Sequence, residues 1–253
     1  MTDSYLVVFF GIGRGGNIAK LYYQKKFRSG CRVMHCYIDQ QFVCNTRSGE
    51  NFNVKEVREL LSPDTIRITE AEVNNFLSSI PSGSLQDSYG DELASVTNLL
   101  KQIYMLNRIC AEITEEYDKY IFIRDDTKTN FSIEMLKKLS FWSNNKPRIF
   151  VPAAHWHGGI CDRFFVVNRK GFNFFLNRLN YTLQLLYRKP IASEYIFRDF
   201  LLAHGYQVYA GAVSVRRIRN GEKVLKDKYY FPVHRPFELF AVLLSILRVK
   251  LRT

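Results

Sequence analysis

Runs of apolar residues alternate with amphipathic stretches along the chain. Residues 5–10 are six consecutive apolar residues that end in a glycine cluster, which predicts a short strand buried on both faces. Asn17 is a suitable N-cap for a helix, and residues 32–39 predict a second strand. The first forty residues therefore predict a strand, a helix and a second strand.

The clearest amphipathic pattern extends over residues 91–116. Its apolar residues recur at steps of three and four, as expected for a long helix that covers one face of a sheet. Residues 120–124 then predict a strand, and Asn130 or Ser132 can cap a helix that reaches residue 139.

The remaining elements alternate in the same way. The expected strands cover residues 65–69, 147–151, 163–168 and 206–213, and the expected helices cover residues 71–78, 170–179 and 193–204. This alternation predicts the α/β class: a Rossmann-related single domain with a mainly parallel central sheet flanked by helices. Ligands of such sheets bind at the carboxyl ends of the strands.

Glycines follow the first predicted strand at the G-x-G-x-x-G spacing, at positions 11, 13 and 16. Backbone N–H groups at such a turn can approach a pyrophosphate. Arg14 adds a guanidinium for anionic oxygens, and Asp39 near the end of the second strand completes a dinucleotide-binding context. The pattern of Gly11, Gly13 and Arg14 indicates phosphate binding, although a tight turn without a ligand has the same composition.

Two adjacent carboxylates, Asp125 and Asp126, follow Arg124 at the predicted end of a strand. Adjacent carboxylates repel each other, so a cation or an arginine is needed to offset their charge. A divalent metal ion bound to a diphosphate would do so. The alternative is a solvated turn in which an aspartate caps the next helix.

Residues 155–163 hold the densest group of candidate functional residues. Trp156 offers a flat apolar face for a sugar or a base, and Gly158 and Gly159 allow close approach of a ligand. His155 and His157 stand two residues apart, a spacing that without a third ligand is more typical of a polar loop than of a metal site.

Asp162 and Arg163 end this segment. A carboxylate here can act as a general base, with Arg163 holding it ionised or contacting phosphate. A purely structural ion pair between the two is the alternative.

These segments together resemble a family of GT-A-type glycosyltransferases found in plants, bacteria and large DNA viruses. The resemblance rests on residues 9–14, 117–118, 120–126 and 156–164, in this order, and covers residues 5–221. The family has Arg-x-Asp at the acidic strand end, matched by Arg124 and Asp126, and then Trp-Gly-Gly-x-x-Asp-Arg-Phe. This chain departs from the second motif by inserting His157, whereas Glu194 and residues 216–221 also match.

The resemblance implies transfer of a sugar from a nucleotide-diphosphate donor, expected to be a UDP- or GDP-sugar, to a glycan, a glycoprotein or another hydroxyl acceptor. It implies Mn²⁺ or Mg²⁺ on Asp126 and, less directly, Asp125, with His204 or His234 as a possible third ligand, and it implies Asp162 as the catalytic base. The expected donor-binding residues are Gly11, Gly13, Arg14, Asp39, Arg124, Asp125 and Arg163. The expected sugar- or acceptor-binding residues are Trp156, His157, Gly158, Gly159 and Glu194.

A Rossmann-type NAD(P)-dependent oxidoreductase is the alternative function. It explains the Gly11 to Gly16 loop and Asp39, but it gives no reason for the acidic strand end or for the segment that contains Trp156 and Asp162.

Charge adds one expectation about partners. The chain has 253 residues with 36 Lys and Arg against 24 Asp and Glu, a net charge of +12. This excess favours an anionic partner, but aromatic pairs such as Phe164 and Phe165 lie in apolar runs typical of a core, so no specific nucleic acid is expected. Five cysteines without a metal or disulfide pattern fit a reducing, cytoplasmic compartment.

The last residues, 222–253, form a basic extension in this interpretation. Residues 237–247 are an apolar stretch followed by Arg248, Lys250 and Arg252. Such a stretch is too short to span a bilayer, but it can pack on the domain as a closing helix or lie peripherally on an anionic membrane.

Overall fold

The fold is taken from a computed structural model. It describes residues 4–11, 27, 31–39, 42–45, 50–53, 64–81, 83, 85–86, 90–137, 145–152, 159–188, 193–211, 213–219 and 223–224. The helix expected after Asn17 and the apolar stretch at residues 237–247 lie outside these residues. The boundary expected at residue 222 therefore stays a prediction.

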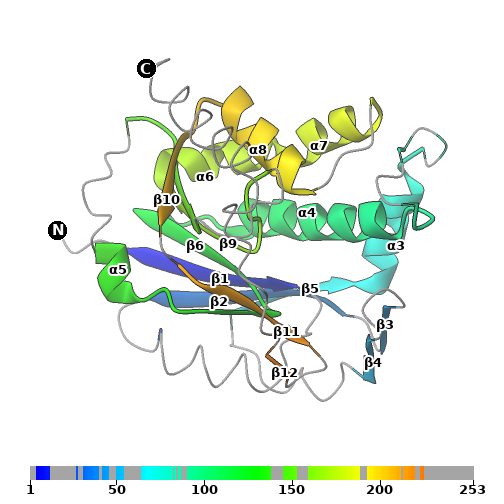
Figure 1. Cartoon of the computed structure of the whole chain (residues 1–253), viewed down its shortest axis with the longest axis horizontal. Helices are drawn as coiled ribbons and strands as arrows, with labels where there is room; N and C mark the ends of the chain where they lie inside the picture. Colours follow the sequence, from blue (N-terminus) through cyan, green and yellow to red (C-terminus); the bar gives the residue numbers. More distant parts are fainter. Residues whose placement is uncertain are drawn as a thin grey trace, which may run out of the picture.

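A seven-stranded sheet forms the centre of the molecule, in the order β10-β8-β9-β6-β1-β2-β5 (Figure 1). Six strands run in the same direction and β9 alone is antiparallel to its neighbours. The predicted mainly parallel sheet is thus confirmed. The strands are β1 (Tyr5–Gly11), β2 (Arg32–Asp39), β5 (Thr65–Thr69), β6 (Lys119–Arg124), β8 (Arg148–Pro152), β9 (Phe164–Asn168) and β10 (Gln207–Gly211).

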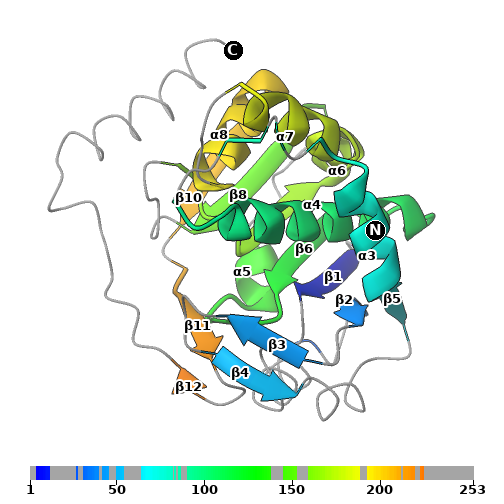
Figure 2. The same ribbon diagram turned by 90° about the vertical axis from the view of Figure 1, so that its right-hand side faces the viewer.

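Helices α3 (Glu70–Ser78), α4 (Ala94–Glu112), α6 (Arg169–Phe175), α7 (Arg178–Leu186) and α8 (Ser193–Ala203) gather on one side of this sheet (Figures 1 and 2). Alternate residues of β1, namely Leu6, Val8 and Phe10, belong to the core that these helices share. The amphipathic pattern of α4 has its physical cause here, because its apolar side chains are buried against the sheet and α7.

The other face of the sheet has its own core. Tyr5, Val7 and Phe9 of β1 belong to one buried apolar cluster with Phe27, Phe131 and apolar side chains of residues 213–218. Both faces of β1 are therefore covered, which explains why its sequence is continuously apolar rather than alternating.

Two small sheets were not predicted from the sequence. In one, β7 (Thr127–Thr129), β11 (Val215–Arg219) and β12 (Lys223–Val224) pair in the order β12-β11-β7, and in the other β3 (Phe42–Asn45) pairs with β4 (Glu50–Asn53). These strands have two to five residues, too few for the period of two to stand out. Strand β7 of the three-stranded sheet begins directly after Asp126.

Two predicted helices differ in extent from the observed ones. The helix expected over residues 91–116 is shorter, since α4 covers Ala94–Glu112. The helix expected over residues 170–179 is wrong as a single element, because α6 ends at Phe175 and α7 begins at Arg178. The Asn177 N–H donates to the Phe174 carbonyl three residues earlier, and this bond ends the α-helical hydrogen-bond pattern.

Ser132 rather than Asn130 caps α5 (Ile133–Lys137), because the Ser132 hydroxyl accepts a hydrogen bond from the Met135 N–H.

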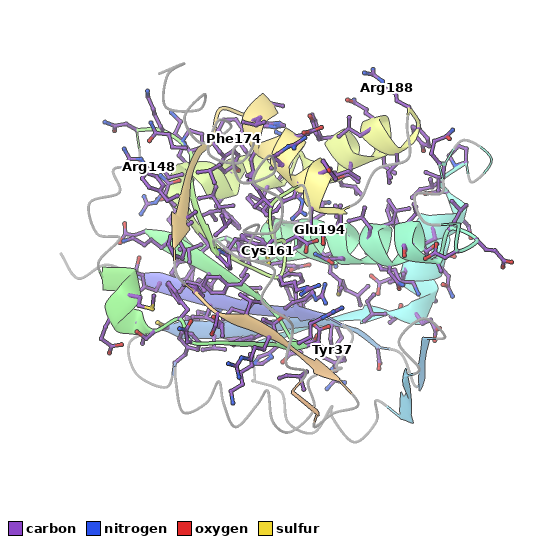
Figure 3. The ribbon with its side chains drawn as sticks, in the orientation of Figure 1. Tyr37, Arg148, Cys161, Phe174, Arg188 and Glu194 are labelled. Carbon is purple, nitrogen blue, oxygen red and sulfur yellow. The ribbon has the colours of Figure 1, made fainter. Side chains whose placement is uncertain are left out.

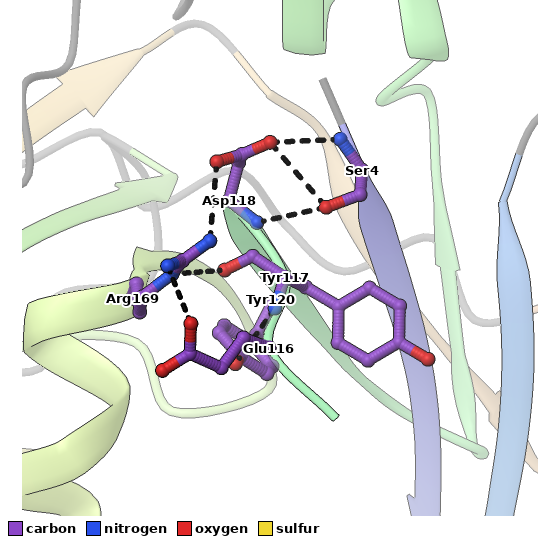
Figure 4. Close-up of polar contacts among 6 residues, drawn as sticks. All are labelled: Ser4, Glu116, Tyr117, Asp118, Tyr120 and Arg169. Atoms are coloured by element: carbon purple, nitrogen blue, oxygen red, sulfur yellow. Dashed lines mark hydrogen bonds and ion pairs between the residues drawn. The ribbon is translucent and has the colours of Figure 1, made fainter. Parts of the chain in front are cut away.

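The edge at which β1 and β6 begin is held by a polar network (Figure 4). The backbone N–H and the hydroxyl of Ser4 donate to the Asp118 carboxylate, and Arg169 at the start of α6 pairs with Glu116 and Asp118. This network ties the first residues of two central strands to a helix. The opposite edge, where the parallel strands end, is called the carboxyl edge below.

Within the described part of the chain, no helix combines the length and the apolar character needed to cross a membrane.

Candidate functional site

Three segments that are far apart in the sequence meet at the carboxyl edge. The Arg124 N–H donates to the Arg163 carbonyl at 2.9 Å, and the Asp125 N–H donates to the Phe10 carbonyl at 2.9 Å. Because β9 is antiparallel to β6, residues just before β9 lie beside the end of β6. The structure therefore brings together Arg124, Asp125, Asp126, Asp162, Arg163 and the Gly11 end of β1, all of which the sequence singled out.

Arg124 and Asp126 form a two-point ion pair. Arg124 Nε lies 2.7 Å from Asp126 Oδ1, and Arg124 Nη2 lies 2.7 Å from Asp126 Oδ2. The Asp126 side chain is 2% exposed and that of Arg124 is 20% exposed. Burial disfavours the charged guanidinium, but Asp126, then Asp162 and Asp125, outweigh it and raise the pKa of Arg124 above its ordinary value.

Asp125 lies against the end of β1. A Cβ atom placed on Gly11 would meet Oδ1 of Asp125 at 2.0 Å, so only glycine leaves room for this carboxylate. The first glycine of the predicted loop thus has a packing role of its own. Gly13 and Arg14, which were expected to bind phosphate, lie outside the described residues.

Asp162 is 3% exposed and precedes β9. Its Oδ2 accepts a hydrogen bond of 3.1 Å from Gln102 Nε2 on α4. Sequence reasoning missed Gln102, although one signal was present: it is a polar residue at a three- and four-residue step from the buried Leu99 and Leu106. This amide donor fixes the direction of the Asp162 carboxylate.

Gly159 and Glu194 are also brought together. The Ile160 N–H donates to the Glu194 carbonyl at 2.9 Å, and a Cβ on Gly159 would lie 2.0 Å from the carbonyl carbon of Glu194. Figure 3 shows Cys161 and Glu194 next to each other above the sheet. The start of α8 therefore packs on the backbone just before Asp162. Trp156, His157 and Gly158, the expected sugar-binding residues of this segment, lie outside the described residues.

A basic strand borders the site. The Ile218 N–H donates to the Asp126 carbonyl at 2.7 Å, and Arg216 and Arg217 lie opposite Lys128 and Thr127 in the pairing of β11 with β7. Residues 216–219, which matched the family pattern, are thus adjacent to Asp126 in space.

Two further expectations have different outcomes. Asp39 ends β2 at the carboxyl edge, with Tyr37 opposite Gly11 in the parallel pairing. His204 is not near Asp126: it follows α8 and precedes Gln207, which begins β10 at the opposite edge. There its ring lies 4.3 Å from that of Phe200, so the expectation that it is a third metal ligand is wrong. His234 lies outside the described residues.

The implied metal ion does not fit this donor set. Both oxygens of Asp126 already accept hydrogen bonds from Arg124, and no group of three His, Cys, Asp or Glu side chains suited to a metal occurs among the described residues. A divalent cation needs several oxygen ligands with lone pairs directed at it. At the end of β6 each Asp126 oxygen already directs one lone pair at a guanidinium, whose positive charge also repels a second cation at this position.

No family model and no curated protein sequence matches the chain. Similar solved structures include xyloside xylosyltransferase 1 from mouse, with a TM-score of 0.43, 12% identity, and coverage of 81% of this chain and 84% of the mouse chain. They also include the glycosyltransferase GlyE of Streptococcus pneumoniae (0.43, 11%, 82% of this chain and 46% of GlyE) and the bifunctional glycosyltransferase WbbM (0.42, 13%, 98% of this chain and 44% of WbbM). The chain spans less than half of the latter two. These are loose similarities, and strand order and direction define the fold described above.

Proposed function

We propose that the protein is a glycosyltransferase that moves a sugar from a nucleoside-diphosphate donor to a hydroxyl group of a glycan or another acceptor. The observation that supports this function best is the meeting of Asp162 and Arg163 with Arg124 at the carboxyl edge, fixed by the bond from the Arg124 N–H to the Arg163 carbonyl. This edge is the place where α/β sheets of this kind bind nucleotides.

The chemistry asks for two things from the protein. As the acceptor oxygen bonds to the anomeric carbon, the bond between that carbon and the phosphate oxygen breaks, and the diphosphate leaves with its electron pair. We assign the stabilisation of that negative charge to the guanidinium groups of Arg163 and Arg124. The acceptor hydroxyl loses its proton, and Asp162 is the carboxylate we assign to accept it.

The surroundings of Asp162 suit a base. Gln102 donates to one of its oxygens, which orients the carboxylate. Gly159, which packs on the backbone of Glu194, directly follows Trp156, His157 and Gly158 in the sequence. We assign the binding of the sugar or of the acceptor to residues 156–159 and Glu194. No step is assigned to a metal ion, because Asp126 is bonded to Arg124.

A thermal-shift panel tests the donor class. UDP-, GDP- and dTDP-sugars and NAD(P) are added separately to the whole chain, because a ligand that binds only the folded state raises its melting temperature. Stabilisation by one nucleotide sugar, lost in Arg163→Gln, supports the transferase. Stabilisation by NAD(P) alone contradicts it and favours the oxidoreductase.

We also propose that the protein acts in the cytoplasm, and that its basic C-terminal residues contact an anionic membrane. Liposome flotation with and without residues 237–253 tests the contact. Flotation of the full chain alone supports it, and equal behaviour of both forms contradicts it.

A further inference from the structure

The ion pair between Arg124 and Asp126 has the geometry of a carboxylate bound to a cation. Each carboxylate oxygen accepts one N–H from the planar guanidinium at 2.7 Å, the two-point arrangement that arginine forms with carboxylates. With Asp126 at 2% exposure, water does not compete for these oxygens.

The guanidinium also has donors to spare. An arginine has five N–H donors, and the bonds to Asp126 use one on Nε and one on Nη2. No other described residue accepts a hydrogen bond from Arg124, and its side chain is 20% exposed at the carboxyl edge. The remaining donors can therefore bind an anionic oxygen that reaches this edge.

Several arginines act on the carboxylates of this region. Asp125, Asp126 and Asp162 all stabilise the charged form of Arg124, and Asp162 also favours the charged form of the buried Arg178. Arg163, whose backbone bonds to that of Arg124 and whose positive charge acts on Cys161, adds a third arginine to this region. The chain itself thus supplies positive charge to these carboxylates, which weakens the electrostatic reason for recruiting a divalent ion.

We infer that the Arg124 guanidinium is the cation of this site: it bridges Asp126 and an anionic ligand oxygen, and the site binds its ligand without Mn²⁺ or Mg²⁺ at Asp126. The identification of that ligand as a nucleoside diphosphate rests on the proposed function. The inference that Asp126 binds no metal ion does not rest on the proposed function. It can be tested by measuring metal binding without any nucleotide.

The test is a titration of the whole chain with Mn²⁺, followed by the electron paramagnetic resonance signal of free Mn²⁺, which decreases as the ion binds. The wild-type protein is expected to leave the signal unchanged. Arg124→Asp creates an Asp-x-Asp sequence and releases the oxygens of Asp126, so one bound Mn²⁺ per chain is expected. Arg124→Gln, which frees Asp126 without adding a charge, is expected to bind Mn²⁺ more weakly.

Arg163→Gln is the matched control, because it removes one positive charge from the same edge and leaves the pair of Arg124 and Asp126 intact. It is expected to bind no Mn²⁺. Circular dichroism establishes that each variant is folded, and the wild-type titration decides even if no variant folds. Stoichiometric binding of Mn²⁺ by the wild type, abolished in Asp126→Asn, would overturn the inference.

A second experiment measures the melting temperature of the protein with and without UDP. If UDP raises the melting temperature, the rise should be equal in a chelator and in Mn²⁺; a rise that requires Mn²⁺ contradicts the inference. If no nucleotide stabilises the protein, the proposed function fails, whereas the Mn²⁺ titration still decides the role of Arg124.

Discussion

The guanidinium carbon of Arg178 lies 4.2 Å from the ring centroid of Phe197, inside the layer of helices. Arg178 is 1% exposed, and its Nε, Nη1 and Nη2 atoms have no hydrogen-bond partner in the described structure. Burial lowers the pKa of Arg178 to about 10, against a smaller opposing effect of Asp162. A charge in this position weakens the fold, and the aromatic ring offsets only part of the cost.

Replacing this charge should stabilise the protein. Arg178→Met keeps a long side chain in the same space and removes three unpaired donor atoms, so we expect the free energy of unfolding to rise by about 1–2 kcal/mol. Chemical denaturation measures it. Arg188→Met, at an exposed position two residues beyond the end of α7, is the control and should change little. A loss of stability in Arg178→Met beyond that of the control would show that the guanidinium has polar partners in solution.

Gly159 should tolerate no side chain. In Gly159→Ala the new Cβ would meet the backbone of Glu194, which belongs to a helix and cannot rotate away. We expect a loss of about 3 kcal/mol in the free energy of unfolding, measured by urea denaturation.

Gly83→Ala is the comparison for this variant, since a Cβ there has nothing within 4 Å and the residue is exposed. It should match the wild type to within about 0.5 kcal/mol. Equal stability of Gly159→Ala and Gly83→Ala would mean that α8 does not pack on Gly159 as described.

His35 should make stability depend on pH. It lies in β2 with its ring centroid 5.0 Å from that of Phe9, and burial lowers its pKa from 6.5 to about 4. Above pH 6.5 the imidazole is neutral in both the folded and the unfolded chain. As pH falls toward 4 the unfolded chain binds the proton first, so up to about 3 kcal/mol of stability is lost across this window.

The difference between wild type and His35→Phe isolates this effect from other titrating groups. The variant removes the titration and keeps a ring beside Phe9. Its stability relative to the wild type should therefore increase as pH is lowered from 6.5 to 4, in urea denaturation at several pH values. A difference that is constant across this window would contradict the burial of a neutral imidazole.

The central elements of the fold could be predicted because their burial is local and periodic. Strand β1 is buried on both faces, so its sequence is continuously apolar. Helix α4 is buried on one face, so its apolar residues recur every three or four positions. The small strands β7 and β11 could not be predicted. They are defined by pairing across more than 80 residues, as in the bond from the Ile218 N–H to the Asp126 carbonyl, and short segments carry no period.

The sequence singled out several residues that the structure brings together at the carboxyl edge, but it did not predict how they pair. Position at the end of a predicted strand singled out Asp126, whereas the dense group of candidate residues at 155–163 and the family resemblance singled out Asp162. An arginine was one of the two partners expected for these carboxylates, but Arg124 itself was not identified as that partner. Asp126 lies in a turn just beyond the end of β6, where no strand period fixes the direction of its side chain. Gln102 was missed because it lies on α4, sixty residues away from the carboxylate it contacts.

The most direct test of glycosyl transfer is the rate at which the protein releases nucleoside diphosphate from the nucleotide sugar that stabilises it, with a hydroxyl acceptor present. Asp162→Asn keeps a side-chain oxygen for Gln102 and cannot accept the proton, so its turnover should fall about 10²–10⁴-fold with donor binding retained. Wild-type release that equals that of Asp162→Asn, for every nucleotide sugar that binds, would contradict the assignment of Asp162 and of the reaction.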